Sequence, residues 1–375
     1  GAIATTTTTV TTITAAMIIN WLAGMLAELW MVAFGQLVFK GRGGVLSAML
    51  YYFLPMVGHF AFADMKIDNA LFFMGTVATY AVFRGLFFVP DDEEQERQEI
   101  SLRPFAWWRP MHTWLLLGGI LAGAAFGFKI TAMMLIFALM AAIAGTQIHW
   151  SAAGAIVLIS FGAYAQQGAL LLSDITSRLG FSTVPSQSTV TLLFLLSGLL
   201  VFIASCWAYR NKCKHGLLAL VVFCVGLLLS ISPWLTHNNI LGGNIIPRPT
   251  FSAPNNLSPS IEIDSLPAEI QLDKSHAACI VTSRDEELGR YWGDRSGITH
   301  YLTLPWRTVM NIDSTGHYVT TMPALLLFPL LLLLPFFWKR EGRWLRWLVF
   351  GTFFMLLQWI FLTNGVPWYG IMMFI

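Results

Sequence analysis

The sequence predicts an all-α integral membrane protein, and two observations support this fold class. Hydrophobic residues make up 56% of the 375 positions and charged residues only 11%, whereas about a quarter of a usual soluble domain is charged. About ten apolar runs also approach the roughly 20 residues that a helix needs to cross a bilayer. We therefore expect about 10–11 transmembrane helices, the last beginning near Trp368. The ten runs cover residues 12–38, 44–62, 69–88, 112–128, 130–146, 151–172, 189–209, 216–234, 321–338 and 345–363.

The long interval between the eighth and ninth runs divides the chain into three parts. Residues 1–234 are expected to form an N-terminal transmembrane bundle, and residues 321–375 to form C-terminal transmembrane helices that are cut off at the chain end. The interval itself, residues 235–320, begins with several Pro and Asn residues and contains an alternating stretch, Ile261–Asp264, that predicts a short strand. Because it is small for an independent core, we expect a loop domain that covers the outer face of the bundle.

The first run has a low-complexity leader, Thr5–Thr9, before it. This leader has neither the basic region nor the small-residue cleavage site of a signal peptide. We therefore expect the chain to start partway through a fold.

Basic residues in the short loops predict the orientation of the bundle. They are concentrated in every second loop, as expected for the cytoplasmic side of a membrane protein. The opposite short loops hold little beyond Lys66, Lys129 and Arg178, so they and the 235–320 loop are expected to be extracytoplasmic, in a bacterial inner membrane or a plasma membrane. The predicted cytoplasmic cations are Lys40, Arg42, Arg97, Arg103, Arg109, Arg210, Lys212, Lys214, Lys339, Arg340, Arg343 and Arg346.

The turn between the second and third runs is the strongest candidate for a functional site. It places Asp64, Lys66 and Asp68 between two apolar segments, and a charge beside hydrocarbon is costly unless it is paired or wetted. Structural alternatives remain open. Asp68 suits a helix cap, Asp64 a solvated loop acid that pairs with Lys66, and Lys129 a snorkelling cation at the outer headgroups.

Other common sites find little support in the sequence. The four cysteines and the scattered histidines show no metal-ligand spacing, and no phosphate-binding glycine loop or nucleophile elbow is present. We therefore predict no cofactor and no metal site, with a divalent-metal requirement left open.

The net charge of +2 and the absence of a basic, aromatic stripe exclude nucleic acid as a partner. Asp91–Arg97 is interpreted as a solvated acidic connection, and Glu28 as a residue hydrogen-bonded inside the bundle.

An extracytoplasmic acid at a membrane surface suits transfer from a lipid carrier. Nucleotide-activated substrates do not cross a bilayer, whereas a sugar linked to a lipid phosphate is available on that side. Asp68 would act as general base on an acceptor hydroxyl, and Lys66 and Lys129 would neutralise the departing phosphate.

Several motifs, in order along the chain, resemble the membrane core of the GT-C glycosyltransferases, which include protein O-mannosyltransferases and the lipid A aminoarabinose transferase. The similarity extends from about residue 25 to the end. It rests on Gly35–Gly44, Pro55 in an apolar run, the Lys66-Ile67-Asp68 turn, Phe126–Ala132, Tyr301–Trp306, Pro323–Pro335 and Asn364–Gly370.

The resemblance implies a polyprenyl- or dolichyl-phosphate sugar donor, transfer with inversion, and an active site between the first two outer loops. Asp68 then matches the acid of the second outer loop, and Lys129 a lysine that meets the lipid phosphate. His300, Tyr301 and Trp306 would contact the donor sugar as lid residues, or anchor the chain at the membrane interface as aromatic belts do. The acceptor, whether protein, glycan or lipid, stays open.

One departure from the family gives a second hypothesis. The principal catalytic Asp of these enzymes lies in the first outer loop, after a helix that this sequence lacks. Either the sequence is incomplete at its front, or the chain is a non-catalytic helical subunit or scaffold that works with other membrane subunits. A transporter, the third alternative, would show charged residues near mid-membrane, and Glu28 is the main example here.

Overall fold

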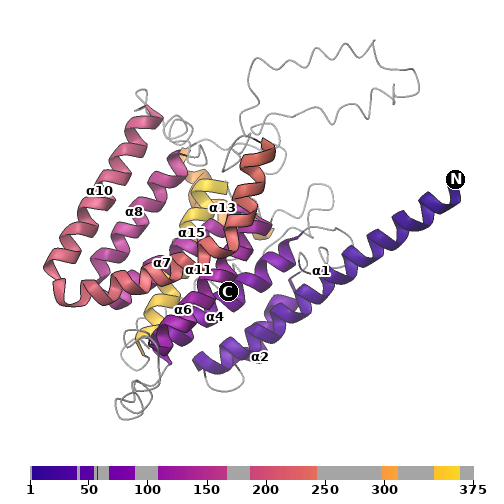
Figure 1. Ribbon diagram of the computed structural model, residues 1–375, viewed down its shortest axis with the longest axis horizontal. Helices are drawn as coiled ribbons and strands as arrows, with labels where there is room; N and C mark the ends of the chain where they lie inside the picture. The colour runs from indigo at the N-terminus through magenta and orange to yellow at the C-terminus, as the bar shows by residue number, and fades with distance from the viewer. Residues whose placement is uncertain are drawn as a thin grey trace.

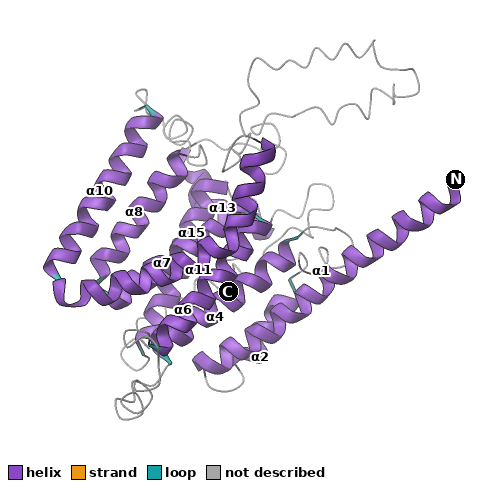
Figure 2. Ribbon diagram, viewed as in Figure 1, coloured by secondary structure: helices purple, strands orange, loops and turns teal. Residues whose placement is uncertain are grey.

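The computed structural model describes residues 2–39, 43–54, 57, 67–88, 109–166, 186–242, 297–310 and 342–363. These parts of the chain are helical and contain no strand (Figure 2). The elements are α1 (Ala2–Phe39), α2 (Gly43–Tyr52), α4 (Asp68–Phe87), α6 (Pro110–Phe128), the 3-10 helix η1 (Ile130–Ala132), α7 (Met133–Gln147), α8 (Trp150–Gln166), α10 (Gln187–Ala208), α11 (Arg210–Gly242), α13 (Gly297–Met310) and α15 (Arg343–Thr363).

Seven of these segments are long and apolar enough to cross a bilayer, which confirms the predicted all-α membrane bundle. They lie in α1, α4, α6, η1 with α7, α10, α11 and α15, while α8 is apolar but shorter. The predicted run 44–62 is described only as α2 and a few following residues, and the run 321–338 and the segment near Trp368 lie outside the described residues. So does the strand predicted at Ile261–Asp264.

Helix α11 is longer than the apolar run that predicts it. The run ends at residue 234, just after Pro233, whereas the helix continues through this proline to Gly242. A proline inside a helix removes one backbone hydrogen bond and bends the helix without necessarily ending it. The first residues of the 235–320 interval therefore belong to the bundle.

Local signals explain where two of the spanning helices begin. Helix α6 has Pro110 in its first turn, where the missing amide hydrogen costs nothing, and the side chain of His112 accepts a hydrogen bond from the amide of Arg109 at 3.0 Å. Helix α10 starts after Ser186, whose hydroxyl accepts a hydrogen bond from the amide of Thr189.

Small residues bring neighbouring helices into close contact. A Cβ atom placed on Gly119 of α6 would lie 2.1 Å from the carbonyl oxygen of Phe223 in α11, and one on Gly226 would lie 2.3 Å from that of Leu116. Gly35 of α1 approaches the backbone of Gly44 in α2 in the same way. Lipid tails are as apolar as leucine, so membrane helices associate through such close packing rather than through a hydrophobic driving force.

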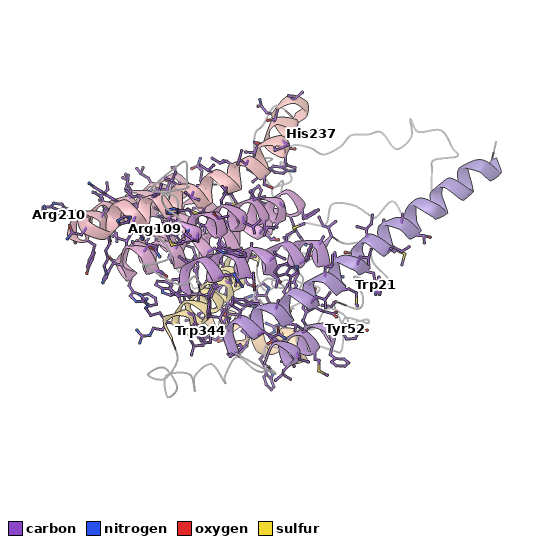
Figure 3. All side chains as sticks on the ribbon, turned by 60° about the horizontal axis from the view of Figure 1, so that its bottom comes forward. Trp21, Tyr52, Arg109, Arg210, His237 and Trp344 are labelled. Atoms are coloured by element: carbon purple, nitrogen blue, oxygen red, sulfur yellow. The ribbon has the colours of Figure 1, made fainter. Side chains whose placement is uncertain are left out.

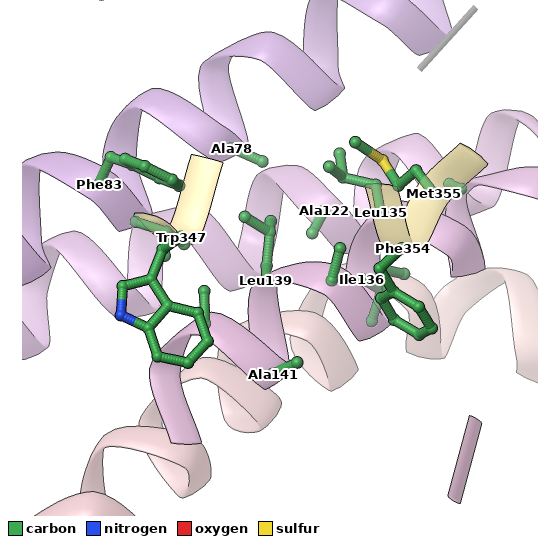
Figure 4. Packing of buried hydrophobic residues seen from close by; sticks show 14 of the residues in the cluster. Ala78, Phe83, Ala122, Leu135, Ile136, Leu139, Ala141, Trp347, Phe354 and Met355 are labelled. Carbon is green, nitrogen blue, oxygen red and sulfur yellow. The ribbon is translucent and has the colours of Figure 1, made fainter. Parts of the chain in front are cut away.

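The centre of the bundle is a continuous apolar core built around α4, α6, α7 and α15. Figure 4 shows Ala78, Ala122 and Leu139 meeting there, with Trp347 of α15 packed along one side. The Trp347 ring lies directly over Gly145 of α7, where any larger residue would collide with it.

Contacts between distant residues define the two ends of the bundle. At one end, which we call the Arg210 end, Phe39 packs on Trp344 and Trp150 stacks on Trp347. At the other, the Asp68 end, Gln187 donates a hydrogen bond to the carbonyl of Ala165 at 2.9 Å. Figures 1 and 3 show this division, with Arg109, Arg210 and Trp344 grouped toward one end and His237 at the other. The described cations of the predicted cytoplasmic loops thus share one end, as the alternation of loops requires.

Candidate functional site

A buried ion pair joins the two turns that the sequence singles out. The ammonium Nζ of Lys129 lies 2.6 Å from Oδ1 of Asp68, although the two residues are 61 positions apart. Asp68 is 1% exposed and Lys129 is 19% exposed. The structure thus brings together the acid and one of the two lysines that the sequence assigns to the same proposed reaction.

Helix geometry positions both partners. Asp68 is the first residue of α4, and α4 packs along α6. Lys129 follows the last residue of α6 with an extended backbone (φ −155°, ψ 131°), which separates α6 from the short helix η1. The carboxylate at the beginning of α4 also benefits from the positive end of the helix dipole.

The helix-cap alternative for Asp68 is only partly met. The N-cap position of α4 belongs to Ile67, whose side chain makes no capping bond, and Asp68 is already inside the first turn. The snorkelling alternative for Lys129 expects a cation that only reaches the headgroups. The ammonium of Lys129 instead pairs with the carboxylate of Asp68.

A second layer of polar residues lies directly behind the ion pair. The hydroxyl of Tyr51 in α2 donates to Oδ1 of Asn69 over 3.4 Å, a long hydrogen bond, and its ring stacks on Phe72 with centroids 4.0 Å apart. Tyr51, Asn69 and Phe72 are all fully buried. Because Asn69 adjoins Asp68 in the chain, this layer fixes the beginning of α4.

Helix α1 closes this layer from the other side. Gly24 is so close to Asn69 that a Cβ atom on it would lie 3.3 Å from Nδ2 of the amide. Glu28 is one turn further along α1 and is partly exposed, and both Glu28 and Asp68 lie within electrostatic range of the Tyr51 hydroxyl. The hydrogen bond expected for Glu28 inside the bundle is not found within the described parts of the chain.

The three candidates on α13 divide between the inside and the outside of this helix. His300 and Tyr301 are buried, whereas Trp306 is 59% exposed. Nδ1 of His300 lies 3.4 Å from a guanidinium nitrogen of Arg307, and the Tyr301 ring packs on Phe361 of α15 at a centroid distance of 5.4 Å. Only Trp306 therefore has the exposure that an interface anchor needs.

A glutamine in α15 connects this helix to α7 and α8 near Lys129. Gln358 is fully buried, accepts a hydrogen bond from the hydroxyl of Tyr164, and donates one to the carbonyl of Met134 at 3.3 Å. Met134 is in the first turn of α7, directly after η1, so the end of α15 and the Tyr301 contact lie at the Asp68 end. Sequence reasoning missed Gln358, Tyr164 and Tyr51, although a buried amide within an apolar run was a usable signal.

Two predicted site residues, Asp64 and Lys66, lie outside the described residues. Among the described ones, no group of three His, Cys, Asp or Glu side chains is arranged to hold a metal ion. The described site thus consists of one buried ion pair, its polar second layer, and a nearby carboxylate on α1.

A comparison with protein-family models, curated proteins and solved structures found no match to this chain.

Proposed function

We propose that the chain is a membrane glycosyltransferase that moves a sugar from a polyprenyl-phosphate donor to an acceptor hydroxyl on the extracytoplasmic face. One observation supports this proposal above the others, namely the ion pair between Asp68 and Lys129 at the end of the bundle. It provides a carboxylate and a phosphate-binding cation side by side, which is what the reaction needs. The ordered motifs that resemble GT-C enzymes agree with it.

In the proposed reaction the two charges exchange partners. The phosphate of the donor attracts the Lys129 ammonium, because a charge-assisted hydrogen bond to phosphate replaces the one to Asp68. The released carboxylate accepts the proton of the acceptor hydroxyl. The acceptor oxygen then bonds to the anomeric carbon from the face opposite the departing phosphate, so the configuration inverts and the lipid phosphate leaves with the electron pair of the broken bond.

Burial has a consequence for this mechanism. Asp68 is almost inaccessible, so the acceptor reaches it only when the partner exchange opens the site. Asp64 and Lys66 belong to the same turn and are proposed to contact the donor. His300 and Tyr301, at the same end of the bundle, are proposed to cover the sugar.

The test is sugar transfer by the full chain in proteoliposomes, using a radiolabelled polyprenyl-phosphate sugar. Asp68→Asn is expected to reduce turnover by a factor of about 10²–10⁴, the usual contribution of a general base. This variant also leaves Lys129 buried without its counter-charge, so its stability must be measured separately.

A double variant separates chemistry from stability. Asp68→Asn combined with Lys129→Met removes both charges, which restores the thermal stability lost in the single variant but not the transfer activity. Turnover at the wild-type rate in either variant would exclude Asp68 as the base.

The second candidate function is a non-catalytic subunit of a membrane complex. The full burial of Asp68 and its bond to Lys129 favour it, because an ion pair that ties α4 to α6 serves assembly equally well. The charge-exchanged variant, Asp68→Lys with Lys129→Asp, distinguishes the two functions. A structural pair keeps its function after the exchange, whereas the transferase loses activity because the base and the cation have changed places.

A further inference from the structure

Three cations are clustered at the turn between α10 and α11, at the Arg210 end and away from the proposed active site. Arg210, Lys212 and Lys214 fall within five positions, and all three are exposed. None of them forms a salt bridge with another residue in the described parts of the chain. The sequence around them offers no counter-charge either, because residues 175–261 contain no Asp or Glu.

Exposed apolar side chains lie next to these cations along the chain. Trp207, in the last turn of α10, is 81% exposed. Further along α10, Leu200 and Ile203 present an apolar surface. A cationic turn, next to a tryptophan and above an apolar helix face, is complementary to an amphiphile with an anionic head and acyl chains. A soluble anion would not use the apolar part of this surface.

The turn is held in place by contacts with the connection between α7 and α8. The ring of Tyr209 stacks on His149 with centroids 4.1 Å apart, and its hydroxyl lies 3.0 Å from Nε2 of the same histidine. The hydroxyl of Ser205 donates to that of Ser151 at 2.7 Å. These contacts fix the backbone that carries the cations before any ligand arrives, which lowers the entropy cost of binding.

One further cation, Arg109, lies at the N-cap of α6. Arg109 and His215 of α11 both lie within electrostatic range of His112 at the beginning of α6. The acidic run Asp91–Glu96 belongs to the loop that precedes α6, and it lies outside the described residues. It is an alternative occupant that the chain itself offers.

We propose that the surface formed by Trp207, Arg210, Lys212 and Lys214 binds the headgroup of an anionic phospholipid, with the acyl chains along α10. The proposal does not depend on the glycosyltransferase function. It requires only that this end of the bundle meets a leaflet that contains anionic lipid.

Trp207 supplies the probe for a direct test. The full chain is placed in nanodiscs that contain brominated phosphatidylglycerol or, at the same mole fraction, brominated phosphatidylcholine, because bromine quenches tryptophan fluorescence on contact. The difference between the wild type and Trp207→Phe isolates the signal of this residue. We expect stronger quenching by the anionic lipid, and we expect the preference to weaken at high salt.

Matched single substitutions test the role of the cations. Lys212→Gln is expected to lower the preference about fivefold, corresponding to about 1 kcal/mol for one basic residue at an anionic surface. Arg343→Gln also removes an exposed cation from the Arg210 end, but it lies outside the proposed surface and should leave the preference unchanged.

Three results would overturn the proposal. Equal quenching by the two lipids would show that the surface meets bulk lipid only. Loss of the preference on adding inorganic phosphate at constant ionic strength would assign the surface to a soluble anion. A preference that appears only after Asp91, Asp92, Glu93 and Glu94 are neutralised would show that the acidic run occupies it.

Discussion

Lys129 is the residue whose role depends most on its surroundings. Its side chain is mostly buried, and its short contact with Asp68 stabilises both charged forms in a place where either alone would be costly. A lysine ammonium is a compact point charge that can change partners, so the same residue can bind a carboxylate when the site is empty and a phosphate when the donor is present.

Substitution of Lys129 separates binding from fold stability. Lys129→Ala is expected to raise the apparent KM for the lipid-linked donor, because the phosphate loses its cation, and to destabilise the bundle by about 3–5 kcal/mol, because Asp68 stays buried without a counter-charge. Transfer kinetics and thermal unfolding in detergent measure the two effects. An unaltered KM together with lower stability would leave Lys129 with a structural role only.

Tyr51 is expected to contribute through its ring more than through its hydroxyl. The bond to Asn69 is long at 3.4 Å, whereas the ring is buried and stacked on Phe72. Tyr51→Phe should therefore cost less than about 1 kcal/mol, and Tyr51→Ala about 3–5 kcal/mol. Comparable losses in thermal unfolding measurements would contradict this division.

At the scale of elements, α6 and α11 are held together at glycines, where the backbones of the two helices come into direct contact. Gly119 and Gly226 each meet the backbone of the partner helix, so their lack of a side chain determines how closely the two helices approach. The sequence predicts both helices from their apolar composition, but apolar composition does not identify which glycines face a partner.

A pair of glycine substitutions tests this packing. Gly119→Ala forces a methyl group against the carbonyl of Phe223 and is expected to destabilise the protein by about 1–3 kcal/mol. Gly154→Ala in α8, where the added Cβ meets nothing within 4 Å, should instead stabilise its helix by about 0.5–1 kcal/mol. Thermal unfolding of both variants in the same detergent provides the comparison, and equal shifts would contradict the assigned contact.

The hydrogen bonds of Gln358 in α15 show why the site could be predicted only in part from the sequence. The charge pattern locates Asp68 and Lys129 at one end, because ionisable residues beside apolar runs are rare and their loops alternate in side. Gln358, Tyr164 and Tyr51 lie within or beside apolar segments, and their roles depend on which helices become neighbours. Rotation of each helix about its own axis decides this, and no pattern in one sequence fixes that rotation when the helices are apolar on most sides.

At the scale of the whole molecule, the alternation of loops could be predicted from the sequence. The described residues of the predicted cytoplasmic loops share the Arg210 end, and those of the predicted outer loops share the Asp68 end. Packing alone does not decide which end faces the cytoplasm, because the apolar helices are symmetric with respect to the two leaflets. The distribution of Lys and Arg provides that expectation.

Labelling from each side of sealed vesicles tests the orientation. In a variant without Cys206, Cys213, Cys224 and Cys279, a single cysteine is introduced by Ser188→Cys at the beginning of α10 or by Asn211→Cys at the beginning of α11. Both positions are exposed. A membrane-impermeant maleimide should label the first only from the extracytoplasmic side and the second only from the cytoplasmic side. The reverse pattern would place Asp68 on the cytoplasmic side and remove the basis of the proposed reaction.

The ion pair between α4 and α6 also has a consequence for biogenesis. While the ribosome is still synthesising the second of these helices, Asp68 has already been delivered to the membrane and its partner Lys129 does not yet exist. The nascent chain must therefore keep an acid near the headgroups, or neutralise it with a proton, until 61 further residues have emerged. We therefore expect helix α4 to reach its final depth only when α6 arrives, and the two helices to leave the insertion machinery as a unit.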